Sequence, residues 1–379
     1  MIGFNKPFVT GNEFKYIEQA IGLEKISGNG EFTKRCQTFF EKKYGFGKCL
    51  LTHSATGALE MAAILADVQP GDEVITPSYT FVSTANAFLL RGASLVFCDS
   101  SADHPNMDAE HLKTLITPKT KAIAVVHYGG RGCGMEEIVD LANKHGLLLI
   151  EDAAQAIDSY YHEKPLGSFG HLAAFSFHET KNIIAGEGGM LVVNDSRFFK
   201  RAEIIWEKGT NRAAFNRREV DKYTWVDIGS SFLPSELTAA FLYAQLEALD
   251  EIQKRRKHLW AHYYDLLFQL QQAGHITLPT EKPGNTGNGH IFYILTRSLQ
   301  ERNALIDFLY NRGIQAIFHY LCLHQSPFYR KLQETQAPLP NAERFEETLV
   351  RLPLFLELSE RQINFIADTI TAFYTGESS

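Results

Sequence analysis

One stretch, L-L-L-I-E-D-A-A-Q-A at Leu147–Ala156, indicates the fold of this chain. Its opening apolar run has no polar alternation, which is typical of a strand buried on both faces of a parallel sheet. Two carboxylates, Glu151 and Asp152, end the run, and ligands of open α/β sheets bind beyond the carboxyl ends of the strands. The stretch therefore predicts a central strand with an acidic residue facing a ligand. Taken alone, Asp152 could equally be a strand-end cap or a metal ligand.

Similar apolar runs occur on both sides of Leu147–Asp152, and amphipathic segments separate them. The other candidate strands are Lys48–Thr52, Glu73–Thr76, Ser94–Cys98, Lys121–His127, Ala173–Phe177 and Gly189–Asn194. Helical patterns lie at Gly57–Ala66, Met107–Leu115, Met135–Lys144 and Arg197–Glu207. Strands that alternate with helices predict an α/β layer with a largely parallel sheet.

A second region follows a long helical stretch from Pro234 to Phe268. After a loop rich in Pro, Gly and Asn at 279–289 come a strand, Ile291–Thr296, and a helix near Arg302–Asn311. We expect a large domain over residues 1–250, which includes an N-terminal arm, and a smaller C-terminal α+β domain over residues 251–379.

Composition excludes several classes of protein. The 379 residues are 45% hydrophobic and carry a net charge of −7, which argues against a broad nucleic-acid-binding surface. No signal peptide and no run of apolar residues long enough to span a membrane can be recognised. The five cysteines are scattered without a C-x-x-C pair, which argues against a disulfide framework or a zinc site. We expect a cytoplasmic protein without a metal.

A second informative stretch is A-A-F-S-F-H-E-T-K-N-I-I-A-G-E-G-G-M at Ala173–Met190. A lysine in a random position is usually solvated, but Lys181 follows the end of a buried strand and precedes a glycine turn. Glycines in such a turn permit positive φ or close approach of two backbones. A lysine amine whose pKa is lowered by burial or by a nearby cation can form a Schiff base with a carbonyl.

A third stretch, T-H-S-A-T-G-A-L at Thr52–Leu59, predicts a strand, a turn and a helix start. Small residues let a ligand approach the backbone, and the helix offers free N–H groups to a phosphate. The stretch has neither the Walker pattern nor G-x-G-x-x-G, so it suits a single phosphate better than ATP or NAD. An ordinary helix cap would explain it equally well.

Together with P-S-Y-T-F-V-S-T-A-N-A at Pro77–Ala87, these motifs occur in an order that resembles the DegT/DnrJ family of sugar aminotransferases. The resemblance extends from G-N-G-E-F-T-K-R near residue 30 to R-L-P-L-F near residue 353. It implies the fold of aspartate aminotransferase (fold type I), with a mixed, mostly parallel sheet, and the cofactor pyridoxal 5′-phosphate (PLP).

The resemblance also implies roles for single residues. Lys181 matches the lysine that holds the cofactor as a Schiff base and moves the substrate proton, and Asp152 matches the partner of the pyridine nitrogen. Gln155 matches a contact of the phenolic oxygen, and Phe81 matches an aromatic that stacks on the ring, although core packing would otherwise be favoured for it. The phosphate cradle corresponds to Ser176 with the backbone of Ala55 and Thr56.

Some positions depart from the common family pattern. Many members carry G-Y-N-Y-R before the long helix, where the asparagine reaches the phosphate in the neighbouring subunit, and this chain has G-S-S-F-L at Gly229–Leu233. Ser231 takes the place of the asparagine and could donate one hydrogen bond over a shorter reach, and Leu233 replaces the arginine. The family's shared active site implies a homodimer.

The G-S-S segment and several other stretches resemble the subgroup that serves enterobacterial common antigen synthesis. This subgroup moves an amino group from L-glutamate to C4 of dTDP-4-keto-6-deoxy-D-glucose, which gives dTDP-4-amino-4,6-dideoxygalactose. Candidate contacts for the nucleotide sugar are Asn211, Arg212, Tyr320 and His324. For His319 and His324, the sequence fits a structural role as well as a contact with the substrate.

Three alternatives differ in how well the motifs fit them. A C3-specific aminotransferase would share every cofactor residue. A dehydratase of the family is disfavoured because those relatives replace the lysine with histidine. A regulatory or binding module without activity is disfavoured because Lys181, Asp152 and Gln155 are all present.

Overall fold

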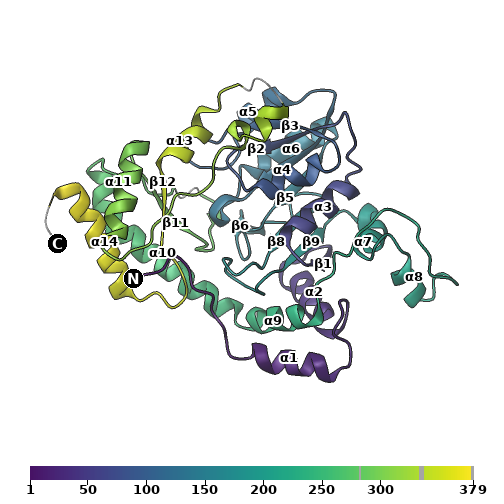
Figure 1. Cartoon of the computed structure of the whole chain (residues 1–379). Coiled ribbons are helices and arrows are strands. Elements are labelled where there is room, and N and C mark those ends of the chain that lie inside the picture. The colour runs from purple at the N-terminus through teal and green to yellow at the C-terminus, as the bar shows by residue number, and fades with distance from the viewer. Residues whose placement is uncertain (281–282, 333–336, 377–379) are drawn as a thin grey trace.

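The central feature of the computed structural model, which describes residues 1–280, 283–332 and 337–376, is a seven-stranded sheet (Figure 1). Its strand order is β3-β2-β4-β5-β8-β9-β1. The strands are β1 (Lys48–Thr52), β2 (Glu73–Pro77), β3 (Ser94–Cys98), β4 (Thr120–Val126), β5 (Leu148–Asp152), β8 (Leu172–Ser176) and β9 (Gly189–Val193). Each lies where the sequence predicts it.

The direction of the strands is mostly parallel. Strands β3, β2, β4, β5 and β8 pair in parallel, and β9 runs antiparallel to both of its neighbours, β8 and β1. The mixed, mostly parallel sheet expected from the sequence is therefore confirmed. Because six strands share one direction, their carboxyl ends meet at one edge of the sheet, and β9 begins at that edge.

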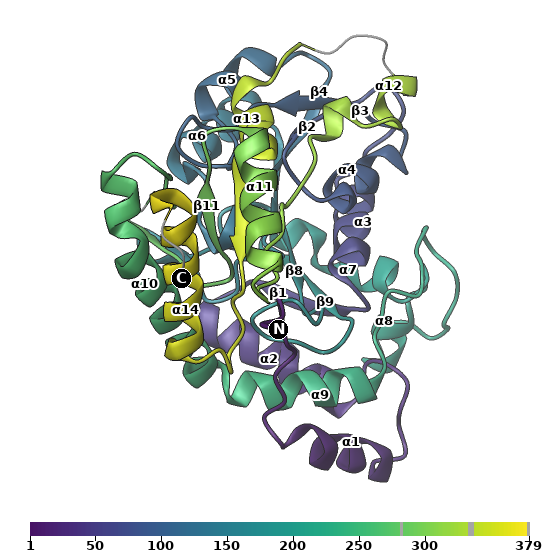
Figure 2. The ribbon, with the colours of Figure 1, turned by 60° about the vertical axis from the view of Figure 1, so that its left-hand side comes forward.

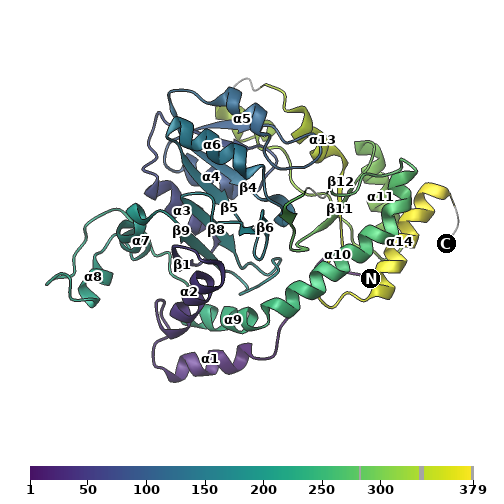
Figure 3. The same ribbon diagram turned by 180° about the vertical axis from the view of Figure 1, so that it is seen from behind.

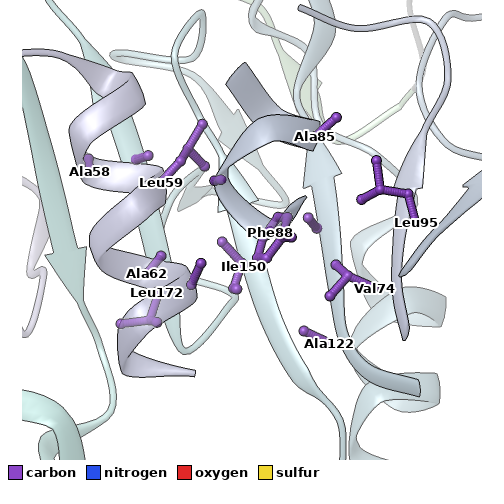
Figure 4. Close-up of a cluster of buried hydrophobic side chains, with 14 of the residues drawn as sticks. Ala58, Leu59, Ala62, Val74, Ala85, Phe88, Leu95, Ala122, Ile150 and Leu172 are labelled. Atoms are coloured by element: carbon purple, nitrogen blue, oxygen red, sulfur yellow. The ribbon is translucent and has the colours of Figure 1, made fainter. Parts of the chain in front are cut away.

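Helices cover both faces of the sheet, as Figures 1 and 3 show. Alternate residues of the strands point to opposite faces. In Figure 4, Val74, Ala122 and Ile150 pack against α3 and α4, whereas their neighbours Ile75 and Ile123 pack against α5 and α6. The helices of this part are α1 (Glu13–Gly22), α2 (Glu31–Tyr44), α3 (Ala55–Leu65), α4 (Val82–Leu89), α5 (Ala109–Leu115), α6 (Met135–His145), α7 (Phe199–Trp206), α8 (Arg212–Asn216) and α9 (Glu236–Glu247).

The C-terminal part is built on a two-stranded antiparallel ribbon of β11 (Phe292–Leu295) and β12 (Leu349–Leu352). Helices α10, α11 and α14 lie around it (Figure 2), and Tyr263, Ile294 and Ile366 belong to their shared apolar core. The helices here are α10 (Leu249–Gln272), α11 (Leu299–Tyr310), α12 (Tyr329–Leu332), α13 (Pro340–Thr348) and α14 (Glu360–Thr375). A small sheet of β6 (Tyr160–Tyr161), β7 (Lys164–Pro165) and β10 (Asn285–Thr286) links the two parts.

The prediction of one continuous long helix is wrong. The stretch predicted as one helix from Pro234 to Phe268 is two helices, α9 and α10, which break at Ala248. Helix α9 packs on α1 and α2, whereas α10 packs on α14, so the chain changes direction between two packing partners. No Gly or Pro marks the break in the sequence. We infer that the domain division proposed near residue 250 falls at this break.

No helix within the described ranges is both long and apolar enough to cross a membrane.

Candidate active site

A cavity of about 430 Å³ lies at the carboxyl edge of the sheet, where residues of the C-terminal part face it. Eight of the residues predicted for the site line this cavity, and they come from several different elements. They are Ala55, Thr56, Phe81, Asp152, Gln155, Ser176, Lys181 and Tyr320.

Asp152 ends β5 and is buried. Its Oδ2 accepts a hydrogen bond of 2.6 Å from the Thr84 hydroxyl, and its Oδ1 accepts one of 3.1 Å from the backbone N–H of Ala154. Thr84 lies in the first turn of α4, a helix that we did not predict although its residues belong to the T-F-V-S-T-A-N-A motif. Two fixed donors hold this carboxylate in one orientation in the cavity.

Lys181 stands in the turn after β8, the strand that pairs with β5. Its backbone N–H donates to the carbonyl of His178 at 2.9 Å, which fixes the start of its side chain. Burial lowers the pKa of the Lys181 amine to about 8, and Arg351 adds to the lowering, while the charge of Asp152 opposes it. A lowered pKa increases the fraction of neutral amine, which is the nucleophilic form.

The glycines of the turn after Lys181 provide a positive φ and a close approach of two backbones, as the sequence predicts. Gly186 adopts a φ of +76°, and a Cβ on Gly189 would collide with the backbone of Ser54 and Ala55. Strand β9 can therefore pass directly against the first turn of α3, which brings that turn to the cavity.

Helix α3 starts two residues before the predicted helix, at Ala55, because the side chain of Ser54 caps it. The Ser54 hydroxyl accepts from the backbone N–H of Gly57 at 3.0 Å. The N–H groups of Ala55 and Thr56 lie in the first turn and so have no partner within the helix. This turn presents free donors and the positive end of a helix dipole to an anion.

Aromatic rings form another wall. The Gln155 side-chain amide donates to the Tyr320 hydroxyl at 2.8 Å and accepts from the Gly129 N–H at 2.7 Å, so its orientation is fixed. The ring of Tyr320 lies 6.3 Å from the half-exposed ring of Phe81 and stacks on His319 at 3.6 Å. His319 also lines the cavity.

Four predicted residues do not line this cavity. His324 is buried between Ser78, at 2.7 Å, and Glu343, at 3.1 Å, so its geometry is that of a structural histidine. Asn211 and Arg212 begin α8, which projects from the body of the chain in Figure 1. Ser231 is exposed and pairs with Glu207 in an isolated bridge.

Residues that we did not predict also line the cavity, and three of them come from distant parts of the sequence. Arg351 lies in β12, His290 precedes β11, and Phe4 lies near the N-terminus. The guanidinium of Arg351 packs over the ring of Phe4 at 4.7 Å. Arg351 is the isolated basic residue of the R-L-P-L-F motif, but no local sequence pattern connects it to Lys181.

The donors and charges of the cavity fit PLP. A buried carboxylate, a partly buried amine and a helix N-terminus face one space, as a pyridinium nitrogen, an aldehyde and a phosphate would require. When bound, PLP supplies an electron sink that stabilises negative charge at the substrate carbon. In that case Lys181 would be placed to hold or release the proton at that carbon, and Asp152 would be placed to keep the ring nitrogen protonated.

Comparison with known proteins supports the same class. SpsC, a spore coat polysaccharide biosynthesis protein of Bacillus subtilis, is 33% identical over 354 residues, or 89% of each chain. GDP-perosamine synthase of Escherichia coli O157:H7 is 31% identical over 371 residues, or 98% of each chain. The PMP form of Spr1654 from Streptococcus pneumoniae superposes with a TM-score of 0.92 at 26% identity, covering 99% of this chain and 100% of that one, and its PLP form has also been solved.

Fold and site thus define a PLP-dependent sugar aminotransferase of fold type I. The sequence profile of the DegT/DnrJ/EryC1/StrS aminotransferase family matches residues 8–371. The chain belongs to that family.

Proposed function

We propose that this enzyme transfers the amino group of L-glutamate to C4 of dTDP-4-keto-6-deoxy-D-glucose, which gives dTDP-4-amino-4,6-dideoxygalactose. The observation that carries the transamination is that the Asp152 carboxylate, at the end of β5, and Lys181, in the turn after the neighbouring β8, line one cavity. The enzyme would run two half-reactions in the same space, first with the amino donor and then with the keto sugar.

The proposed roles follow the geometry of each residue. Lys181 holds PLP covalently and moves a proton in each half-reaction, because its lowered pKa allows it to act as a base near neutral pH. Asp152 pairs with the ring nitrogen, and Gln155 contacts the phenolic oxygen. Phe81 packs on the ring, and the phosphate binds Ser176 and the first turn of α3.

An acidic amino donor fits the charges of the cavity. Arg351 and Lys181 both face it, and burial lowers the pKa of the Arg351 guanidinium. Arg351 is half-buried, and removing a guanidinium from water is costly unless an anion pairs with it. Nε of Arg351 has no hydrogen-bond partner among the described residues, and we propose that the guanidinium binds a carboxylate of L-glutamate.

The choice of sugar rests on sequence stretches that resemble the C4-specific subgroup. They include F-S-F-H-E-T-K-N at Phe175–Asn182, E-K-G-T-N-R at Glu207–Arg212 and V-D-K-Y-T-W at Val220–Trp225. A C3-specific enzyme of the same family is the second candidate, since it would use the same cofactor residues.

We further propose a homodimer whose partner subunit completes the site. The segment around α8 exposes Tyr223 (52%), Trp225 (78%) and Val226 (50%), a concentration of apolar surface that is unusual on a monomer. Asn211 and Arg212 lie in this segment, so they would reach the nucleotide in the partner's cavity and not in their own. Sedimentation equilibrium tests this proposal, and an active monomer would contradict it.

The experiment that tests the reaction is an assay with L-glutamate and a panel of C4- and C3-keto sugars carried on dTDP. A GDP-linked keto sugar belongs in the panel because one relative is named a GDP-perosamine synthase. NMR of the product identifies the aminated carbon and its configuration. Amination at C3, or of the GDP sugar alone, would contradict the proposed substrate.

A further inference from the structure

His290 belongs to a buried network of polar side chains that lies beside Lys181 and was not predicted from the sequence. The network joins the loop before β11 to the Lys181 turn and to α10. His290 is 5% exposed and lines the cavity. Because His290 and Lys181 line the same cavity, the hydrogen bonds that the ring can make bear on the amine.

The side-chain amide of Asn182, the residue after Lys181, has only one possible orientation. Its Nδ2 lies 2.9 Å from the backbone carbonyl of Asn288 and 2.8 Å from Oε1 of Gln253. A backbone carbonyl can only accept, so Nδ2 must be the atom that faces it. The Oδ1 of Asn182 is thereby fixed as an acceptor.

This orientation determines the tautomer of His290. Nδ1 of His290 lies 2.9 Å from Oδ1 of Asn182, so Nδ1 must carry a proton and donate it. The backbone of His290 is held as well, since its N–H donates to Asn288 at 3.0 Å and its carbonyl accepts from Arg256 at 2.7 Å. One hydrogen bond thus fixes the ring and two fix the backbone of His290, and none of the three involves Nε2.

The surroundings also keep the ring neutral. Burial lowers the pKa of His290 well below its ordinary value, and the positive charges of Lys181, Arg256 and Arg351 lower it further. A neutral ring protonated at Nδ1 has a lone pair at Nε2. Nε2 is therefore a hydrogen-bond acceptor in a region of positive charge.

We propose that His290 is a positioning residue for Lys181, whose amine donates a hydrogen bond to Nε2 of the Nδ1-protonated ring held by Asn182. This inference rests on the proposed function only in naming Lys181 as the reactive amine. The bond would aim the amine at the carbon where it exchanges a proton. The bond would also stabilise the ammonium form, because an ammonium group is the stronger donor.

The direct test is the tautomer of His290 in the cofactor-free protein. With 15N-labelled histidine, the two-bond proton–nitrogen NMR spectrum distinguishes the tautomers, and the signal of His290 is the one lost in His290→Asn. We expect a neutral ring with the proton on Nδ1 at pH 7. A proton on Nε2, or a charged ring, would overturn the proposal.

The second test follows the capture of PLP by Lys181 as a function of pH, using the near-visible absorbance of the product. His290→Asn keeps a donor for Asn182 but has no atom at the position of Nε2, whereas His290→Gln places a carboxamide there. We expect the midpoint of the pH profile to fall by roughly one pH unit in His290→Asn, a tenfold change in free amine, and to recover partly in His290→Gln. His262→Asn, on the outer face of α10, is the matched control and should not move it.

The other charged or titratable groups around Lys181, namely Asp152, Arg351 and His319, are the same in all four proteins. An unchanged midpoint in His290→Asn, or equal shifts in both His290 variants, would overturn the proposal. Both tests use only the protein and PLP. Failure to aminate any keto sugar would therefore contradict the proposed function without affecting them.

Discussion

Replacing Asp152 by asparagine removes the charge that we assign to the ring nitrogen of PLP and changes little else. The asparagine can turn its Oδ1 to the Ala154 N–H and its Nδ2 to Thr84, whose hydroxyl reverses and accepts. The fold should therefore persist. The loss is one charge-assisted hydrogen bond to the cofactor, about 1.5–3 kcal/mol, which corresponds to a roughly 13- to 160-fold slower turnover at about 1.36 kcal/mol per tenfold.

The assay is single-turnover reaction of the PLP-loaded enzyme with L-glutamate, followed by the loss of the absorbance due to lysine-bound cofactor. Asp108→Asn, which changes a carboxylate at the N-cap of α5 outside the cavity, is the matched control and should react at the wild-type rate. Thermal unfolding confirms that both variants are folded. A rate for Asp152→Asn within about twofold of wild type would refute the reasoning, because a bond of this kind contributes well over that factor.

Three further predictions address other groups. Because the pKa of Lys181 is lowered to about 8, roughly one tenth of the amine is neutral at pH 7, and the rate of PLP capture should rise through pH 8 and level off above it; a rise only near pH 10 would contradict this. Arg351→Gln should raise KM for L-glutamate about 10- to 100-fold and change kcat less, in steady-state assays at saturating keto sugar; an unchanged KM would exclude it as the carboxylate ligand. Glu236→Ala should lower the free energy of unfolding by about 3 kcal/mol in urea titrations, because Gly30, Phe32 and Thr33 lose the buried acceptor of their N–H groups; a loss under about 1 kcal/mol would argue against this.

The part of the site that the sequence predicts consists of short motifs at strand ends. Asp152, Ser176 and Lys181 each follow or end an apolar run, and parallel strands bring their carboxyl ends to one edge without further information. The first turn of α3 is predictable for the same reason, since it follows β1. These residues could be assigned to one site before any tertiary contact was known.

The remainder of the site depends on contacts between distant segments. Arg351 and His290 reach the cavity because the C-terminal part folds beside the large sheet, and Phe4 reaches it because the N-terminal segment pairs with the C-terminal part at Ile314. His324 illustrates the opposite case, because its motif suggested a substrate contact and its side chain is taken up by Ser78 and Glu343. Local sequence carries no signal for such pairings.

In the fold, too, local sequence predicts some features, and contacts between distant segments determine the others. The seven strands have apolar runs that identify them, whereas the break at Ala248 results from a change of packing partner between two helices of unremarkable sequence. Helix α4 is short, and its polar first turn is typical of a loop in the sequence. Only the structure shows that Thr84 in this turn donates a hydrogen bond to Asp152.

The central claim is that Lys181 is the lysine that binds PLP. Reduction of the PLP-loaded protein with borohydride, followed by digestion and mass spectrometry, identifies the lysine that carries the cofactor. We predict a single modified peptide that contains Lys181 and a protein without near-visible absorbance in Lys181→Ala. Modification of another lysine, or no chromophore after PLP is added to the wild-type chain, would contradict the account.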